Sequence, residues 1–348
     1  AILWCSRLSN VMIFGLGGVG WGAIELLART RGITRIVGAD FDERCRPRVF
    51  SAIYGASFAG HYPDIEFVRV DVNDIDQTAQ LIENENPDMI LGCVTLQSWW
   101  VAYTFPPDVA ERLSVHNTGI GPWLPMHLLL MLKLMKAVKK SGVKCYVLNS
   151  SYPDVVCPVL SKIGLTPTVG MGNMDLMAQA VRYVAGKRLG VPWRNVRVYM
   201  IAPHFVETCI WETGWMKDAP YYLKIMVGDK DVTDKVDRKS MFTEISKNAH
   251  GPFVGGMEQM FISASLVKNA LGILFNTNEI THAPGPNGLP GGYPVRLNAK
   301  GAEVFLPEEV TLKQAIDIND EANKFDGIEK IEDDGTVIYT ENSMKNMK

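Results

Sequence analysis

The chain lacks the sequence features that define several special classes of protein. Its six cysteines, at positions 5, 45, 93, 145, 157 and 209, include no C-x-x-C spacing. We therefore expect buried, reduced thiols rather than disulfides, and no metal site. The apolar run 126–135 is interrupted by Lys133 and is too short to span a bilayer. The first seven residues lack the charged-then-apolar layout of a signal peptide, so we expect a cytoplasmic protein.

An excess of charge of either sign is also missing. The sequence has 35 Lys and Arg residues against 38 Asp and Glu residues, a net charge of −3, and no basic stripe. This balance argues against nucleic acid or a membrane surface as a partner. A length of 348 residues, with 47% hydrophobic and 21% charged residues, is typical of an ordinary globular protein of about two domains.

The most informative stretch lies near the start of the chain. Four apolar residues, 11–14, run directly into Gly15-x-Gly17-x-x-Gly20, and a helical pattern follows over 23–30. This order predicts a buried strand, a tight glycine turn and the beginning of a helix. The first glycine permits the turn, the second lets the backbone approach a pyrophosphate, and the third lets helix and strand pack closely. The alternative is that the glycines serve packing alone.

An acidic residue supports the nucleotide interpretation of this turn. The stretch 33–40 is a second predicted strand, and it ends at Asp40, 20 residues after Gly20. A carboxylate at that point binds the ribose hydroxyls of NAD and repels the extra phosphate of NADP. Asp42 competes with Asp40 for this role. We therefore predict NAD as the cofactor and a small molecule as the substrate.

Strand and helix patterns alternate through the first half of the chain. The expected strands continue over 67–70, 89–94, 143–148 and 168–171, with helices over 75–85 and 126–140. Such alternation indicates a doubly wound parallel sheet, which binds ligands at the carboxyl ends of its strands. The predicted cofactor contacts are Gly15, Gly17, Gly18, Val19, Gly20, Asp40, Thr95 and Asn149.

The remaining chain is expected to form a second domain. The predicted boundary is 1–172 and 173–348, with a hairpin-like tail from about 328. In the second part we expect helices over 175–189, 257–275 and 311–325, strands over 196–201, 293–297 and 303–306, and an irregular polar stretch over 224–237. The aromatic-rich segment 95–125 is expected to be irregular. It acts either as a lid over the substrate or as packing within the fold or between subunits.

Four stretches together resemble the lactate/malate dehydrogenase superfamily. They are the glycine turn with Asp40, the strand and turn 147–153, the stretch 169–175 with its helix, and the strand 198–204. The resemblance implies an α/β fold, in which a Rossmann doubly wound sheet is followed by an α+β catalytic domain. It also implies that His204 is a general acid and base that Asp175 orients, and that Asn149 lies beside the nicotinamide. Asn149 could instead close the turn before Pro153.

The chain departs from this superfamily at the groups that grip the substrate. The arginine that clamps a carboxylate three residues after the helix aspartate is replaced by Ala178, and the lid stretch 97–105 has no arginine. These losses argue against a small 2-hydroxy acid, because a guanidinium fork is what binds a carboxylate. We predict hydride transfer between NAD and a secondary alcohol or ketone of a larger molecule. The predicted substrate contacts are Tyr152, Trp99, Trp100, Phe205, Arg182 and Glu258.

Two other functions remain open at this point. One is a redox-neutral enzyme that retains NAD, such as an epimerase, a lyase or a glycosidase-like hydrolase; the related glycosidases carry a metal-binding cysteine where this chain has Gly172. The other is a non-catalytic NAD-binding module. The resemblance also implies a homodimer or homotetramer, with the helices over 175–189 and 257–275 serving either as subunit contacts or as core.

Overall fold

The computed structural model describes residues 9–249 and 257–348. Its first half is built on a six-stranded parallel sheet with strand order β3-β2-β1-β4-β5-β6. The strands are β1 (Ser9–Phe14), β2 (Ile33–Asp40), β3 (Asp64–Arg69), β4 (Met89–Gly92), β5 (Tyr146–Asn149) and β6 (Val169–Gly170). The strand order reverses between β1 and β4, and ligands of such sheets bind outside the carboxyl ends of the strands at that point.

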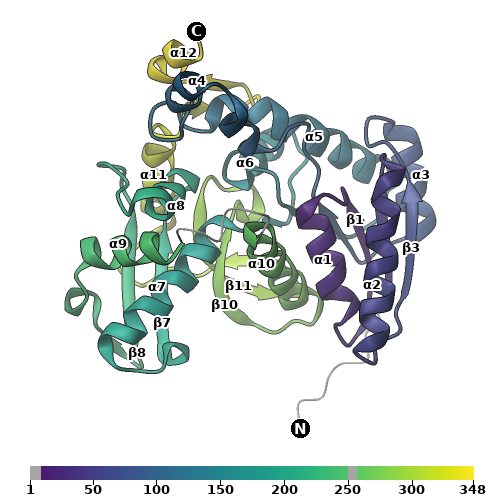
Figure 1. The fold of residues 1–348 in the computed structure, drawn as a ribbon, viewed down its shortest axis with the longest axis horizontal. Helices are drawn as coiled ribbons and strands as arrows, with labels where there is room; N and C mark the ends of the chain where they lie inside the picture. Colours follow the sequence, from purple (N-terminus) through teal and green to yellow (C-terminus); the bar gives the residue numbers. More distant parts are fainter. Residues whose placement is uncertain (1–8, 250–256) are drawn as a thin grey trace.

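Helices cover both faces of this sheet (Figure 1). They are α1 (Gly18–Ala28), α2 (Arg46–Phe58), α3 (Ile75–Glu85), α5 (Leu124–Ser141) and α6 (Pro153–Lys162). Alternate residues of β1 face opposite ways: Val11 and Ile13 pack with α1 and α2, whereas Met12 and Phe14 pack with α3 and α5. Burial on both faces explains why the strand is apolar at every one of these positions. The predicted fold class is confirmed.

The second half contains a small antiparallel sheet with helices packed against it. Its elements are α7 (Asn173–Leu189), β7 (Val196–Ile201), α8 (His204–Thr213), β8 (Tyr222–Val227), β9 (Lys230–Asp231) and α9 (Arg238–Ala249). The expectation of an irregular stretch over 224–237 is wrong. The strand β8 pairs with β7, and Leu223 and Ile225 are buried against the helices. Successive side chains of a strand point to opposite faces, so a stretch in which apolar and polar residues alternate can bury one face and expose the other.

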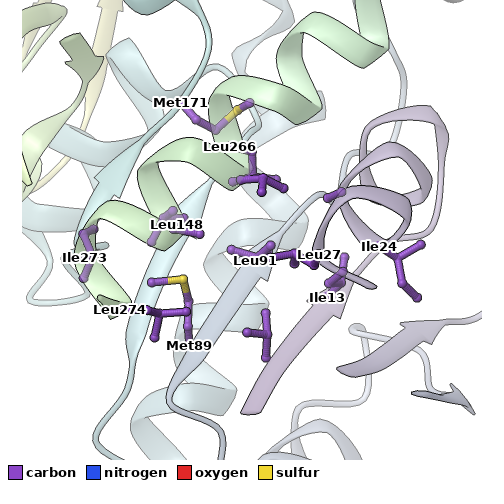
Figure 2. Close-up of a cluster of buried hydrophobic side chains, with 14 of the residues drawn as sticks. Ile13, Ile24, Leu27, Met89, Leu91, Leu148, Met171, Leu266, Ile273 and Leu274 are labelled. Atoms are coloured by element: carbon purple, nitrogen blue, oxygen red, sulfur yellow. The ribbon is translucent and has the colours of Figure 1, made fainter. Parts of the chain in front are cut away.

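The elements that follow join the two halves. They are α10 (Met257–Leu274), β10 (Glu279–Pro284), β11 (Gly292–Asn298) and β12 (Gly301–Val304). In Figure 1 they lie between the purple first strands and the teal second half. Figure 2 shows Leu266 and Ile273 of α10 among side chains of the parallel sheet, with Leu148 close to them. The buried apolar side chains of α7 and α10 therefore belong to the core of the chain, whereas Met260 and Phe261 of α10 are exposed.

The C-terminal segment folds back onto the first half. It comprises α11 (Leu312–Asn323), β13 (Ile328–Ile331), β14 (Val337–Tyr339) and α12 (Glu341–Met347). The strands β13 and β14 form the predicted hairpin. Ile328 joins the core under α3 and α5, and the backbone N–H of Gly121 donates to the carbonyl of Asp326 at 2.7 Å. The chain around residue 326 is thus built into the first half.

The segment over 95–125 is not wholly irregular, as was expected. It contains the short helices η2 (Trp99–Thr104), α4 (Pro107–Arg112) and η3 (Gly121–Trp123). The five cysteines that the structure describes are all free thiols, and Cys5 lies outside the described residues. None of the helices within 9–249 and 257–348 is both long and apolar enough to cross a membrane.

Candidate active site

The glycine turn between β1 and α1 has the geometry that its sequence predicts. Gly15 adopts φ +86°, a conformation that favours glycine. A Cβ on Gly15 would overlap the carbonyl oxygen of Cys93, and a Cβ on Gly20 would overlap the carbonyl oxygen of Gly15. These two glycines are therefore required for the close packing of the turn, the strand β4 and the helix α1.

The outer side of the same turn is open. A Cβ built on Gly17 meets no atom within 4 Å among the described residues. Gly17 is the N-cap of α1, has no side-chain cap, and no acidic residue lies in the first helical turn. An uncapped helix N-terminus with room in front of it fits a pyrophosphate, because its N–H groups and dipole favour an anion. The helix α10 borders this region, since Ser263 Oγ donates to the Val19 carbonyl at 2.8 Å and Gln259 lies against Gly18.

Asp40 lies at the end of β2, beside the glycine turn. Its carboxylate accepts the backbone N–H of Leu16 at 2.6 Å and that of Asp42 at 2.9 Å. Asp42, the competing acid, instead forms an ion pair of 2.7 Å with the exposed Arg44. The carboxylate of Asp40 is thus the one that the fold fixes against the turn.

His204 begins α8, directly after β7. Its backbone N–H donates to Asp154 Oδ1 at 3.0 Å. The ring is engaged at both nitrogens: Nδ1 lies 3.1 Å from Asp326 Oδ2, and Nε2 lies 3.2 Å from the Thr208 hydroxyl one turn further along α8. Asp326 is fully buried, whereas the His204 side chain retains partial exposure. This arrangement is a histidine held by a buried carboxylate.

The expected pairing of His204 with Asp175 is not the one in the structure. Asp175, in the first turn of α7, accepts hydrogen bonds from Ser265 Oγ at 2.6 Å, Lys268 Nζ at 2.6 Å and Thr281 Oγ1 at 3.2 Å. Ser265 and Lys268 lie on α10 and Thr281 lies on β10, so side chains of two other elements bind this carboxylate of α7. Asp175 therefore contacts Lys268, and the carboxylate at the His204 ring is Asp326.

Tyr152 links His204 and Asp326 to a second histidine, His127, and together these residues form a buried polar cluster. It follows β5 in a left-handed conformation with φ 42°, and its hydroxyl donates to Asp326 Oδ2 at 2.8 Å. Its ring meets those of His204 and His127 edge-on, with centroid distances of 5.4 and 6.1 Å. His127 Nδ1 lies 3.4 Å from the hydroxyl of Thr95, which follows β4. The cluster thus reaches the carboxyl ends of β4 and β5, where the sheet topology places a ligand.

The two histidines of this cluster are driven to opposite protonation states. Burial alone lowers the pKa of His204, but the carboxylates of Asp326 and Asp154 outweigh it and raise that pKa to about 9. Burial lowers the pKa of His127 to about 4, helped by the charge of His204. Burial also raises the pKa of Asp154 to about 6. At neutral pH His204 is therefore an imidazolium and His127 a neutral ring, a separation typical of acid–base sites.

Several side chains that were predicted to contact the cofactor or the substrate make contacts within the fold. Asn149 closes the turn after β5, because its Oδ1 accepts the backbone N–H of Ser151 at 2.8 Å and its Nδ2 donates to the Ser151 carbonyl at 3.1 Å. Phe205 is fully buried and packs on Phe325 with ring centroids 5.6 Å apart, so it is core rather than pocket wall.

Arg182 also lies away from the cluster. Its guanidinium donates to the carbonyls of Trp193 and Arg194 at 3.0 and 2.9 Å, so it holds the turn after α7 rather than a substrate. The remaining predicted substrate contacts, Trp99, Trp100 and Glu258, have side chains outside the part of the chain that the structure describes.

Sequence reasoning missed three members of the cluster: Asp326, Asp154 and His127. Asp154 directly follows a proline that begins α6, a position where an acid stabilises a helix, so its sequence context indicated only a cap. His127 lies within an apolar helix pattern and Asp326 in the connection after α11. Only the tertiary fold brings them beside Tyr152, and no local spacing could have indicated it.

Comparisons with known proteins agree with this architecture. Residues 11–97 match the family model described as the saccharopine dehydrogenase NADP binding domain. A search of curated protein sequences found no match. Solved structures with a similar fold include a lactate dehydrogenase from a Medee basin deep-sea metagenome library, with a TM-score of 0.64 and 17% identity over 92% of this chain and 97% of that one.

Two further structures are similar over nearly their whole length. The lactate dehydrogenase of Cryptosporidium parvum, complexed with lactic acid and nicotinamide adenine dinucleotide, has a TM-score of 0.63 and 15% identity over 91% of this chain and 96% of that one. The malate dehydrogenase of Picrophilus torridus has a TM-score of 0.64 and 16% identity over the same shares. The fold is therefore that of the lactate and malate dehydrogenases, as the sequence resemblance predicts.

Proposed function

We propose that this protein is an oxidoreductase that uses a nicotinamide dinucleotide and acts on a secondary alcohol or ketone, with His204 as the general acid and base. The observation that carries this proposal is the buried His204–Asp326 contact in a dehydrogenase fold. The ring contacts Tyr152, which follows β5, and the open glycine turn lies at the end of β1 in the same sheet. This arrangement supports a dinucleotide and a proton-transfer group at one edge of the sheet.

We propose NAD rather than NADP as the dinucleotide. The residues that would hold it are the N–H groups around Gly17 for the pyrophosphate and Asp40 for the ribose. The carboxylate of Asp40 would repel a phosphate on that ribose. The family model that matches residues 11–97 describes an NADP-binding domain. A comparison of the affinities for NADH and NADPH therefore tests the role of Asp40 directly.

A dinucleotide held at the glycine turn would supply or accept the hydride, and the side chains of this protein would move the proton. Asp326 occupies Nδ1 of His204, so Nε2 is the nitrogen that exchanges a proton with the substrate. A substrate oxygen at Nε2 takes the place of the Thr208 hydroxyl. In the reducing direction the imidazolium donates its proton to the carbonyl oxygen, and Asp326 stabilises the charged ring before that transfer.

A neutral substrate fits the residues at the positions where keto-acid enzymes use arginine. Ala178, at the clamp position of α7, is buried in the core of the second half. Arg182, one turn further on, is bound to backbone carbonyls. We therefore propose an alcohol or ketone without an adjacent carboxylate, on a molecule larger than lactate or malate.

The pH dependence of the reaction tests this assignment. With NADH and a panel of ketones, kcat/KM for reduction is expected to be constant around neutral pH and to fall roughly tenfold per pH unit above about 9, because His204 loses its proton there. The reverse oxidation needs the neutral ring, so it is expected to rise roughly tenfold per pH unit up to about pH 9 and to level off above that pH. Assays of NADH consumption measure the reduction, and assays of NADH formation measure the oxidation. A reduction profile that already declines around pH 6.5, the ordinary pKa of histidine, would contradict the proposed role of the imidazolium.

The same assays separate the other candidate functions. An enzyme that retains its dinucleotide would change the substrate without net consumption of NADH. A binding module would change neither. The buried carboxylate at His204 favours catalysis over binding alone, since a binding module has no need of a histidine whose pKa is raised to about 9.

A further inference from the structure

We propose that Asp326, in the connection between α11 and β13, is the positioning carboxylate of His204, and that Asp175 has no part in that role. The catalytic consequence rests on the function proposed above, whereas the pairing itself can be tested without a substrate. Asp326 is buried and is not expected to contact the substrate or the dinucleotide. It acts through the imidazole that it holds.

Three separate segments fix the carboxylate of Asp326. Its Oδ1 accepts the backbone N–H of Ile120 at 2.8 Å, and its Oδ2 accepts the hydroxyl of Tyr152 at 2.8 Å. The contact of 3.1 Å with His204 Nδ1 is made by the same Oδ2. The Asp326 side chain is 0% exposed. A buried carboxylate with all these partners has one orientation, so it can hold the imidazole ring in one orientation too.

This contact fixes the chemistry of the ring. A carboxylate accepts and does not donate when ionised, so Nδ1 carries a hydrogen and faces Asp326. The other nitrogen, Nε2, is thereby the one that gains and loses a proton. The charge on Asp326 also favours the imidazolium over the neutral ring, which makes His204 a proton donor at neutral pH.

The other polar groups around His204 do not take this position. Asp154 contacts the backbone N–H of residue 204 rather than the ring. Glu207 accepts the indole N–H of Trp211 at 2.9 Å, and His127 is driven to the neutral state. Thr208 and Tyr152 contribute hydroxyl and ring contacts without charge. Among the described residues, the carboxylate in contact with the His204 ring is that of Asp326.

Asp175 has a different set of partners. Lys268 balances its charge at 2.6 Å, and the hydroxyls of Ser265 and Thr281 donate to its two oxygens. The superfamily arrangement, in which the α7 aspartate orients the histidine, is thus replaced by one in which the C-terminal segment supplies the carboxylate. The acid–base group is complete only when that segment has folded back onto residues 120–121.

The test is an NMR titration of the His204 imidazole in the full-length protein without ligand. In Asp326→Asn the pKa of His204 is expected to fall by about one to three pH units, the range that an adjacent opposite charge contributes. In Asp175→Asn it is expected to stay at the wild-type value. Tyr152→Phe removes a partner of Asp326 but keeps the charge, so the pKa of His204 is expected to stay raised. An unchanged pKa in Asp326→Asn, or a fall in Asp175→Asn, would overturn the proposal.

Two further measurements keep the result interpretable. If Asp326→Asn does not fold, Asp326→Glu retains the charge in a longer side chain, and it is expected to keep a raised pKa of His204 and to preserve the position of the pH break in kcat/KM. A shift of that break to the ordinary histidine range in Asp326→Glu would contradict the proposal. The proposed function can fail on its own. It would do so if His204→Asn kept full turnover while the titrations of Asp326→Asn still showed that Asp326 raises the pKa of His204.

Discussion

Replacement of His204 by asparagine is expected to lower kcat/KM for NADH-dependent ketone reduction by about 10²–10⁴-fold, the usual contribution of a positioned general acid. An asparagine amide can still donate to Asp326, so the substitution removes the exchangeable proton while the buried carboxylate keeps a partner. The affinity for NADH is expected to be unchanged, because the open side of Gly17 is formed by a separate turn. Steady-state kinetics on the best ketone of the panel, together with NADH titration, measure the two quantities.

A second histidine provides the matched control for this experiment. His61 lies between α2 and the edge strand β3, and it lines a pocket with residues 30–34, 62 and 63, none of which belongs to the cluster. His61→Asn is expected to retain kcat/KM within about twofold, since surface substitutions away from special features change little. If His204→Asn also retains wild-type turnover, another group transfers the proton and the assignment of His204 is wrong.

Replacement of Asp175 by alanine is expected to lower the free energy of unfolding by about 3 kcal/mol. Removal of one partner of a buried ion pair costs roughly 3–5 kcal/mol, because the other charge stays buried without compensation. Asp175 is 3% exposed, whereas Lys268 is 27% exposed, which places the effect at the lower end of that range. The hydroxyls of Ser265 and Thr281 lose an acceptor as well. Urea unfolding measures the loss as a lower midpoint at an unchanged m-value.

A double variant shows whether the loss comes from the ion pair. Asp175→Leu with Lys268→Met replaces both charges by apolar groups, and it is expected to recover most of the stability that Asp175→Ala loses. If Asp175→Ala instead unfolds at the wild-type urea concentration and loses as much turnover as His204→Asn, then Asp175 acts on the histidine, as the resemblance implied.

Local patterns were sufficient to predict the parallel sheet and the glycine turn. The apolar run into Gly15 and the acid at Asp40 are features of consecutive residues, and the structure places both as expected. The helix α2 was not predicted, because its buried side is formed mainly by the small residues Ala52 and Ala56 and its apolar pattern is weak.

The acid–base cluster could be predicted only in part. The position of His204 at the end of β7 follows from the strand pattern, whereas its partner Asp326 lies 122 residues away in sequence. The resemblance implied that Asp175 orients His204. That expectation is wrong because the carboxylate of Asp175 forms an ion pair with Lys268 on α10. Charge pairing between elements far apart in sequence is decided by tertiary packing, which a single sequence does not display.

The central claim is that the turn around Gly17 binds NAD beside the His204–Asp326 pair, and calorimetric titration with NADH and NADPH tests it most directly. Wild type is expected to bind NADH more tightly than NADPH. Gly17→Ala is expected to unfold at the wild-type urea concentration, since a Cβ there meets no atom of residues 9–249 and 257–348 within 4 Å. It is nevertheless expected to bind NADH at least about tenfold more weakly, because that Cβ would enter the space of the pyrophosphate. Tighter binding of NADPH would contradict the role of Asp40. The absence of heat with both dinucleotides, or equal NADH affinity in Gly17→Ala, would contradict the account as a whole.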